Sequence, residues 1–339
     1  MQTVIVISFF AGLLLVQLFF WAVLLRVGLR WVKASNVSRR RVVATVLCTL
    51  AFNLIMFIVY SLFTPKGPEA LAVHIGVCVI IVCGPISIVM QVFNISFGRA
   101  VRAWLPTLVS PAVFVAFALL VVRPYVFKTF TPAMMSMAPT LLPGHRAGKC
   151  NQCGETAYVG VVTYSDGSRQ MSGPGICKTN FHVEYQNTYD SRVFSSDRFL
   201  VAKYLKPQRW DLIVFKSPEK PERIYIKRLV GLPGEEITIR DGKVYANGKP
   251  LTPPESIRRI EYASDMNLPQ GAMWGAPDNP AKLADDEYFV LGDFSMRSFD
   301  SRIWEKGAAG RSPFAVPESH LRGVVTHIYW PMSRWRAFR

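Results

Sequence analysis

Four long apolar runs in the first third of the chain constrain its fold more than any other feature. They cover residues 4–25, 42–63, 71–93 and 105–122, and each has about the ~20 residues that an α-helix needs to cross the hydrocarbon core of a bilayer. A cleaved signal peptide does not explain the first run, because no basic segment precedes it. Residues 1–123 are therefore predicted to form a membrane region with about four transmembrane helices. The fourth run is the weakest, and a buried core helix is the alternative for it.

Basic residues predict the orientation of these helices. Residues 1–123 contain 10 Lys and Arg and a single acid, Glu69. The segment 26–41 holds six of the basic residues, and the segment 94–104 contains Arg99 and Arg102. Because basic loops stay on the cytoplasmic side, both segments should be cytoplasmic and everything after residue 123 extracytoplasmic. We expect a multi-pass protein of the inner or plasma membrane whose partners include the lipid bilayer.

The net charge of +16 does not indicate a nucleic-acid partner, because most of the excess lies beside the apolar runs. Asn53 and His74 are the polar residues within those runs, and hydrogen bonds between helices are the simplest role for them. The three cysteines of this region are expected to act as small apolar packing residues; they are Cys48, Cys78 and Cys83.

From residue 124 onward, short alternating runs separated by turn signals predict an all-β domain. Asp241-Gly242 and Asn247-Gly248 are typical of hairpin turns, because both pairs tolerate positive φ. Residues 250–287 show no clear periodicity and are expected to form a surface excursion. The predicted strands are residues 199–205, 210–215, 223–231, 235–240, 288–291 and 323–330.

Two residues of this domain are candidates for chemistry. Ser136 lies in a methionine-rich segment, where a plain turn serine is the alternative interpretation. Lys227 lies in a strand whose period of two places it between the apolar faces of Tyr225 and Leu229. An exposed lysine is the commoner outcome, but burial would favour the neutral amine and make Lys227 a base near neutral pH.

Four ordered segments carry a resemblance to a known family. They are SMAPTL at 136–141, RWDLIVF at 209–215, YIKRLVGLPGE at 225–235, and LGD at 291–293 followed by SFDSR at 298–302. Together they resemble the motif boxes of type I signal peptidases, also called leader peptidases, over most of residues 124–339. The resemblance implies a multi-span membrane region followed by an all-β catalytic domain with a Ser-Lys dyad. It also implies an endopeptidase that removes N-terminal signal peptides from exported preproteins and needs no cofactor for catalysis.

The resemblance assigns roles to individual residues. Ser136 matches the nucleophile and Lys227 its general base, so that a single neighbouring group activates the serine. Ser298 matches the serine that hydrogen-bonds the lysine. Asp300 and Arg302 match the pair that supports the site.

The substrate is expected to add a strand beside residues 133–136 and 224–227 through main-chain hydrogen bonds. Small side chains at the first and third positions before the cut would occupy shallow apolar pockets, with Ile226 among the walls. The candidate substrate-contact residues are Ala133, Met134, Met135, Ile224, Tyr225 and Ile226.

Two residues depart from the family pattern. Met134 stands where many members have a Ser or Gly, and a thioether cannot donate a hydrogen bond to the developing oxyanion. Phe294 stands where the family usually has Asn. Met134 and an insertion between Gly144 and Asp197 together motivate a second hypothesis, a catalytically weak homologue that binds extended peptides without cleaving them.

An insertion at about residues 145–196 interrupts one motif, between Gly144 and Asp197, and its ends should lie close together. It contains a Cys-x-x-Cys-Gly sequence that resembles one knuckle of a zinc ribbon. The second knuckle has Cys177 but Asn180 where a fourth cysteine would be expected, and His182 would complete a tetrahedral site. A structural zinc site is predicted, and a disulfide or free thiols are the alternatives outside the cytoplasm. The candidate ligands are Cys150, Cys153, Cys177 and His182.

Overall fold

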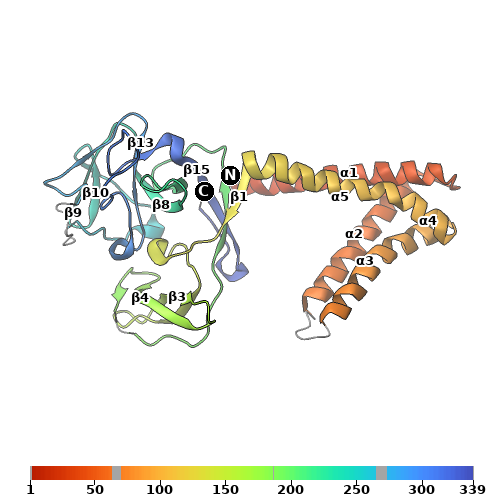
Figure 1. The fold of residues 1–339 in the computed structure, drawn as a ribbon, viewed down its shortest axis with the longest axis horizontal. Coiled ribbons are helices and arrows are strands. Elements are labelled where there is room, and N and C mark those ends of the chain that lie inside the picture. The colour runs from red at the N-terminus through yellow and green to blue at the C-terminus, as the bar shows by residue number, and fades with distance from the viewer. Residues whose placement is uncertain (1, 63–69, 186, 265–272, 339) are drawn as a thin grey trace. The chain divides into compact units, whose positions relative to one another are not determined.

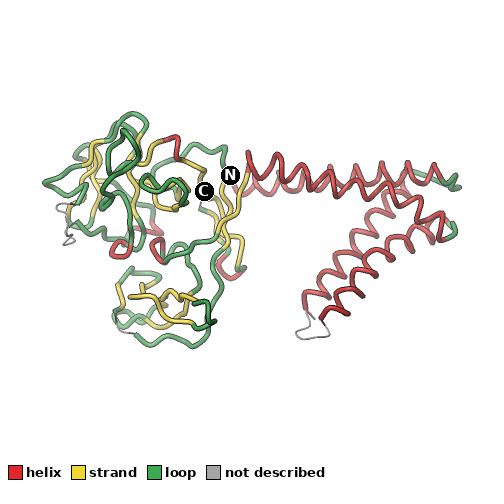
Figure 2. The backbone as a smooth tube through the Cα atoms, viewed as in Figure 1, coloured by secondary structure: helices red, strands yellow, loops and turns green. Residues whose placement is uncertain are grey.

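The computed structural model describes residues 2–62, 70–185, 187–264 and 273–338 (Figure 1). The chain divides into two compact units, Met1–Val122 and Arg123–Arg339. The first is helical and the second is built from strands and loops (Figure 2). Four long apolar helices followed by a β-rich domain are what the sequence predicted.

Four helices of the described chain are long and apolar enough to cross a membrane. The last of them runs from Phe97 to Val126 through several consecutive segments. Residues 97–104, predicted to lie in a loop, are instead helical, because they continue directly into the fourth apolar run. The helical segments are α1 (Gln2–Trp31), α2 (Arg39–Leu62), α3 (Ala70–Phe93), α4 (Phe97–Trp104), η1 (Leu105–Leu108), α5 (Val109–Phe117) and η2 (Ala118–Val126).

Small residues let these helices approach closely. A Cβ on Gly28 of α1 would lie 1.9 Å from the carbonyl oxygen of Ala103 of α4, so only glycine fits there. Between α2 and α3, which lie side by side (Figure 1), the rings of Tyr60 and His74 meet edge to face at 5.3 Å. His74 thus contributes to helix packing through its ring. Asn53 Oδ1 accepts no hydrogen bond from the described residues.

The second unit contains a large sheet and two smaller ones. The large sheet has eight strands in the order β1-β6-β15-β7-β8-β13-β14, with β16 pairing to β15. Its strands are β1 (Phe127–Phe130), β6 (Arg198–Ala202), β7 (Leu212–Lys216), β8 (Ile224–Gly231), β13 (Glu287–Leu291), β14 (Val316–Pro317), β15 (Leu321–Trp330) and β16 (Arg336–Ala337). A second sheet has the order β11-β10-β9-β12, with β9 (Glu236–Arg240), β10 (Lys243–Ala246), β11 (Lys249–Pro250) and β12 (Ala281–Lys282).

Each predicted strand is present, with ends shifted by a few residues. Asp241 and Asn247 have φ values of 48° and 51°, as expected for the two hairpin turns. The prediction for residues 250–287 was partly wrong. Ile257, Ile260 and Tyr262 are buried in the core beside the second sheet, because irregular segments without a strand period can still pack apolar side chains inward.

A third sheet forms within residues 145–184, in the order β2-β3-β4-β5 (Figure 1). At the base of this segment, His145 and Phe194 exchange backbone hydrogen bonds of 3.2 and 2.8 Å. We call residues 145–196 the inserted module. Its strands are β2 (His145–Lys149), β3 (Thr156–Thr163), β4 (Arg169–Cys177) and β5 (Val183–Glu184).

Candidate active site

Ser136 and Lys227 lie together in the second unit. Ser136 sits in a single turn of 3-10 helix, η3 (Met135–Met137), and Lys227 lies in the middle of β8. Lys227 Nζ is 2.8 Å from Ser136 Oγ. The lysine is only 5% exposed, so its amine is enclosed by the sheet and the segment that carries Ser136. The arrangement suits transfer of the serine proton to a neutral amine.

Burial sets the protonation of this lysine. Desolvation lowers the pKa of Lys227 to about 8, and the negative charge of Asp300 opposes that shift. A neutral amine is therefore accessible slightly above neutral pH, whereas an exposed lysine remains charged there.

Ser298 is buried in the site, but the predicted hydrogen bond to Lys227 is not formed. Its Oγ has no hydrogen-bond partner among the described residues. The side chain instead lies against Gly292, where a Cβ would come within 2.0 Å of Ser298 Oγ. The missing side chain of Gly292 provides the room, and the hydroxyl group keeps its hydrogen-bonding capacity for a reacting group.

Asp300 and Arg302 form a fully buried ion pair with an Nε–Oδ1 distance of 2.9 Å. The Asp300 carboxylate also accepts the backbone N–H of Gly292 at 2.9 Å. Arg302 donates to both the carbonyl and the hydroxyl of Ser295, at 2.7 and 2.8 Å. The pair therefore holds both ends of the segment 292–295 next to Ser298.

A second buried pair joins β8 to the segment that carries Ser136. Arg228 donates to both carboxylate oxygens of Asp293, at 2.7 and 2.5 Å. Thr140 donates its hydroxyl to the same carboxylate. Because Thr140 follows Ser136 by four residues, this network ties the segment around Ser136 to the strand that carries Lys227.

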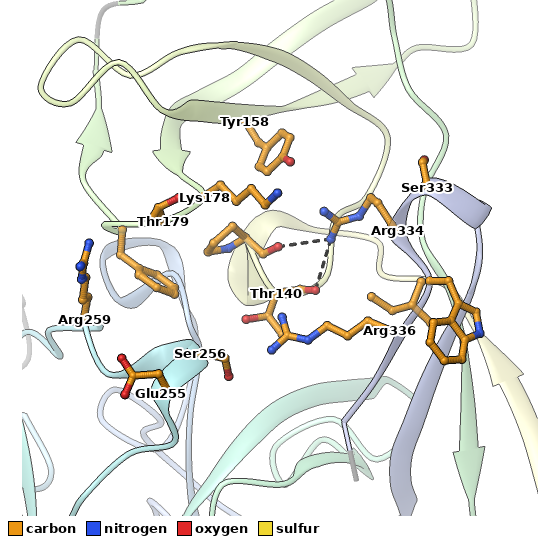
Figure 3. Close-up of a pocket in the computed structure, with 14 residues that line it drawn as sticks. Thr140, Tyr158, Lys178, Thr179, Glu255, Ser256, Arg259, Ser333, Arg334 and Arg336 are labelled. Carbon is orange, nitrogen blue, oxygen red and sulfur yellow. Dashed lines mark hydrogen bonds between the residues drawn. The ribbon is translucent and has the colours of Figure 1, made fainter. Parts of the chain in front are cut away.

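The C-terminal segment supplies a further support. Arg334 pairs with Asp197 at 2.7 and 2.9 Å and donates to the carbonyls of Pro139 and Thr140 at 3.3 Å. Arg334 and Arg336 both line a cavity of about 540 Å³. Figure 3 shows the Arg334 guanidinium on the side of Tyr158 and Lys178 of the inserted module, and that of Arg336 beside Thr140. Neither Ser136 nor Lys227 lines this cavity. Arg334 therefore contributes to the site by holding the backbone that follows Ser136.

One edge of β8 is available to an extended peptide. The backbone of Leu229 donates to the carbonyl of Asp211 and accepts from the N–H of Trp210, both just ahead of β7. The odd-numbered residues of β8 therefore direct their backbone N–H and C=O groups toward β7. Since these directions alternate along a strand, Ile224 and Ile226 point theirs to the opposite side. On that opposite side, β13 reaches only residues 228–231, and residues 224–227 have no strand partner there among the described residues. Their other side is paired with β7.

The six candidate substrate-contact residues are not equivalent. Ala133, Met134 and Ile224 are exposed, while Tyr225 and Ile226 are partly buried. Met134 has an extended backbone with φ −136° and ψ 163°, which suits strand pairing. Met135 is 3% exposed and packs inward against Ala138, Leu142 and Phe294. Its side chain is therefore not available to a peptide, and only its backbone remains as a contact.

The four candidate metal ligands of the inserted module come together. Their donor atoms all lie within 4.8 Å of one another. Cys153 Sγ and Cys177 Sγ are 3.6 Å apart, and Cys150 Sγ and His182 Nδ1 are 3.5 Å apart. Asn180, at the position of the missing fourth cysteine, instead uses its side-chain oxygen to accept a hydrogen bond from Arg259. This cluster can hold a metal ion.

Several supporting residues were not assigned as site residues from the sequence. Arg228 and Asp293 lie inside the quoted motifs, and their charges, one within the apolar strand β8 and one just after β13, were a usable signal. Asp197 and Arg334 are 137 positions apart, and no local pattern relates them. Phe294 packs in one buried cluster with Met135 and with Ile176 of the inserted module, a contact between distant segments that no local pattern of the sequence shows.

A family model described as "Signal peptidase, peptidase S26" matches residues 176–330. This segment contains Lys227 and Ser298, whereas Ser136 precedes it. A protein of Leptolyngbya laminosa called "Signal peptidase I" is 30% identical over 150 residues, which are 41% of this chain and 63% of that protein. The chain thus spans less than two thirds of that relative.

"Signal peptidase I P" of Bacillus subtilis subsp. natto is 34% identical over 150 residues, 42% of this chain and 73% of that protein. The chain is also similar to a solved signal peptidase I from Enterococcus faecalis V583, with 31% identity and a TM-score of 0.26. That match covers 36% of this chain and 98% of the solved chain.

Proposed function

The chain belongs to the signal peptidase I family, peptidase family S26, and we propose that it is a membrane-bound serine endopeptidase that removes N-terminal signal peptides from exported preproteins. The observation that carries this proposal is the 2.8 Å contact between the buried amine of Lys227 and the hydroxyl of Ser136. A buried lysine beside a serine has a direct chemical use, because its neutral amine can accept the serine proton.

In the proposed reaction, the amine of Lys227 takes the proton of Ser136 as the serine oxygen attacks the scissile carbonyl. The resulting ammonium gives that proton to the leaving amine when the peptide bond breaks, which leaves an acyl-enzyme on Ser136. Lys227 then takes a proton from the water that attacks the ester, and returns it to the Ser136 oxygen as the acyl group leaves, which restores the serine hydroxyl and the neutral amine. The buried hydroxyl of Ser298 can hydrogen-bond the amine during these transfers. No step requires a cofactor.

The exposed edge of β8 supports the proposed mode of substrate binding. An extended peptide can pair with Ile224 and Ile226 on one side and with the extended backbone at Met134 on the other. The proposed substrate thus occupies the position of an added strand. The oxyanion would be stabilised by backbone donors such as the N–H of Ser136, since Met134 offers none.

We also propose a multi-pass protein with residues 26–41 and 94–104 on the cytoplasmic side and the second unit outside. The basic residues of the first unit support this orientation. Signal peptides present their cleavage region on the outer face, where this topology would put Ser136.

The four clustered side chains are proposed to bind a structural zinc ion. A tetrahedral site with bonds of about 2.0–2.3 Å has ligand atoms roughly 3.5–3.8 Å apart, and the observed 3.5 and 3.6 Å separations fit that geometry. Cys150, Cys153, Cys177 and His182 would hold the ion as a cross-link between β2, the loop before β3 and the end of β4. The proteolytic chemistry does not involve this site.

The full chain, reconstituted in liposomes, tests the proposed activity with a signal-bearing precursor. We expect cleavage by the wild type and a loss of at least ~100-fold in Ser136→Ala and Lys227→Ala. Ser333→Ala and Lys243→Ala change an exposed serine and an exposed lysine of the same unit and serve as matched controls. Equal cleavage by all variants would refute the dyad. Binding of the precursor without cleavage by the wild type would support the peptide-binding alternative.

A further inference from the structure

The inserted module is in direct contact with the loop that carries Ser298. Arg297, the last residue of η5 (Ser295–Arg297), immediately precedes Ser298. Its guanidinium donates to the carbonyls of Ser172 and Pro174 of β4, the latter at 3.1 Å, and to the hydroxyl of Ser172 at 3.1 Å. No carboxylate among the described residues forms an ion pair with it. Arg297 is therefore held by the backbone of the inserted module.

The conformation of β4 is adapted to this contact. Gly173 lies between the two accepting residues and has a φ of +63°. A Cβ at this position would lie 2.9 Å from the Arg297 guanidinium carbon. Glycine thus provides both the backbone conformation and the space that the guanidinium occupies.

A second contact joins the module to the nucleophile segment. Phe294 is fully buried in an apolar cluster with Met135, Leu142 and Ile176, of which Ile176 belongs to β4. Met135 precedes the nucleophile directly, and a Cβ on Gly160 of β3 would lie 2.7 Å from its Cγ. The module therefore provides the wall against which Phe294 and Met135 pack.

The same loop touches the site on its other side. The backbone N–H of Phe294 donates to the carbonyl of Ser136 at 3.1 Å. Ser298 lies in the site with an unsatisfied hydroxyl. The short segment 294–298 is thus fixed to the inserted module by the side chains of Phe294 and Arg297. The same segment contacts Ser136 through the backbone of Phe294 and places Ser298 in the site.

We propose that Arg297 is a positioning residue for peptide-bond cleavage, and that the inserted module acts through it and Phe294 as part of the active-site scaffold. The inference rests on the proposed peptidase function. Reactive groups must be held to within about 0.5 Å of productive geometry, and a 1 Å displacement can lower a rate about 100-fold. Releasing Arg297 frees the segment that bears Ser298 without removing any group that touches substrate.

The test uses Arg297→Ala, Arg297→Lys and Gly173→Ala in the full-length chain. We expect kcat for a precursor to fall at least ~10-fold in Arg297→Ala, with KM within about twofold because the β8 edge is intact. Arg297→Lys should recover part of the rate, since an ammonium can reach one carbonyl but not both. Gly173→Ala should lower kcat in the same way, because a Cβ there would displace the Arg297 guanidinium from β4.

Amide hydrogen exchange of residues 292–302 gives a readout that needs no activity, and exchange should be faster in Arg297→Ala. Arg311→Ala, which removes an exposed pair with Asp286, is the matched control. Unchanged exchange in Arg297→Ala overturns the inference even if the wild type cleaves no precursor. In an active wild type, unchanged kcat or a loss confined to KM also overturns it. Absence of wild-type cleavage by itself refutes the proposed function instead.

Discussion

Lys227 Nζ lies 2.8 Å from Ser136 Oγ, although 91 positions separate the two residues in the chain. Because the base must be neutral to accept a proton, the wild-type kcat/KM should rise with pH through an apparent pKa near 8, the value that burial gives to Lys227. Below that pH the rate should fall about tenfold per unit. Steady-state kinetics from pH 5 to about 10 on a peptide without titrating groups would measure this. A flat profile across this range would contradict a lysine base.

Burial of the lysine also predicts how stability changes with pH. The folded-state pKa is about 8 and the ordinary value is 10.5. Between these values the unfolded chain binds the proton and the native state does not, so the free energy of unfolding should rise with pH. Below pH 8 both states are protonated and the native state carries the whole penalty of a buried charge.

Lys227→Met removes that penalty. We expect the variant to be more stable than the wild type by roughly 1–3 kcal/mol at pH 7, and the difference to shrink as pH rises toward 10.5. Denaturant unfolding of the second unit within the full chain at several pH values measures the difference. If the difference in free energy of unfolding between variant and wild type grew at alkaline pH, the prediction would be contradicted.

The buried pair of Asp300 and Arg302 should have a large effect on stability. Arg302→Met leaves the Asp300 carboxylate buried without its partner, and removing one member of such a pair typically costs about 3–5 kcal/mol. Arg311→Met breaks an exposed pair with Asp286, for which about 0–1 kcal/mol is expected. Thermal unfolding of both variants gives the comparison. Equal destabilisation would show that Asp300 gains another partner or becomes protonated.

Much of the site could be predicted from the sequence because its signals are local. The alternation around Lys227 predicts a strand with a lysine between apolar neighbours, and the structure buries that lysine. The hydrogen bond expected between Ser298 and Lys227 is absent because the Ser298 side chain packs against Gly292. The alternation of residues along a strand does not reveal such a contact. The support from Arg334 and Asp197 depends on two segments, 137 positions apart, that meet only in the fold. Phe294 became interpretable only with the wall of the inserted module in place.

The exposed edge of β8 predicts a selective effect on substrate binding. Ile224→Pro removes a backbone N–H that points away from β7, so the sheet keeps its hydrogen bonds. We expect KM for an extended peptide to rise about 10-fold, the equivalent of one hydrogen bond, with little change in melting temperature. Tyr225→Pro is the matched control, because its N–H points toward β7 and its loss should lower the melting temperature. An unchanged KM in Ile224→Pro would place the substrate elsewhere.

The cysteine cluster predicts a link between metal content and catalysis. Cys177 is the last residue of β4, the strand whose carbonyls accept from Arg297. Removing zinc should loosen this end of β4 and therefore lower kcat, by less than the Arg297→Ala change because the rest of the strand stays paired with β3. Purified full-length protein should contain about one zinc per chain, and Cys153→Ser should lose most of it, since structural sites need all four ligands.

Cys83→Ser is the control, because Cys83 lies in α3 and outside the cluster. Mass spectrometry for metal, alkylation of the denatured unreduced protein and cleavage kinetics would be measured on the same samples. Bound zinc with three reactive thiols in the module and a chelator-dependent fall in kcat are the expected results. Protected thiols with no metal would instead identify a disulfide. Zinc loss without any change in kcat would show that β4 keeps Arg297 in place through strand pairing alone.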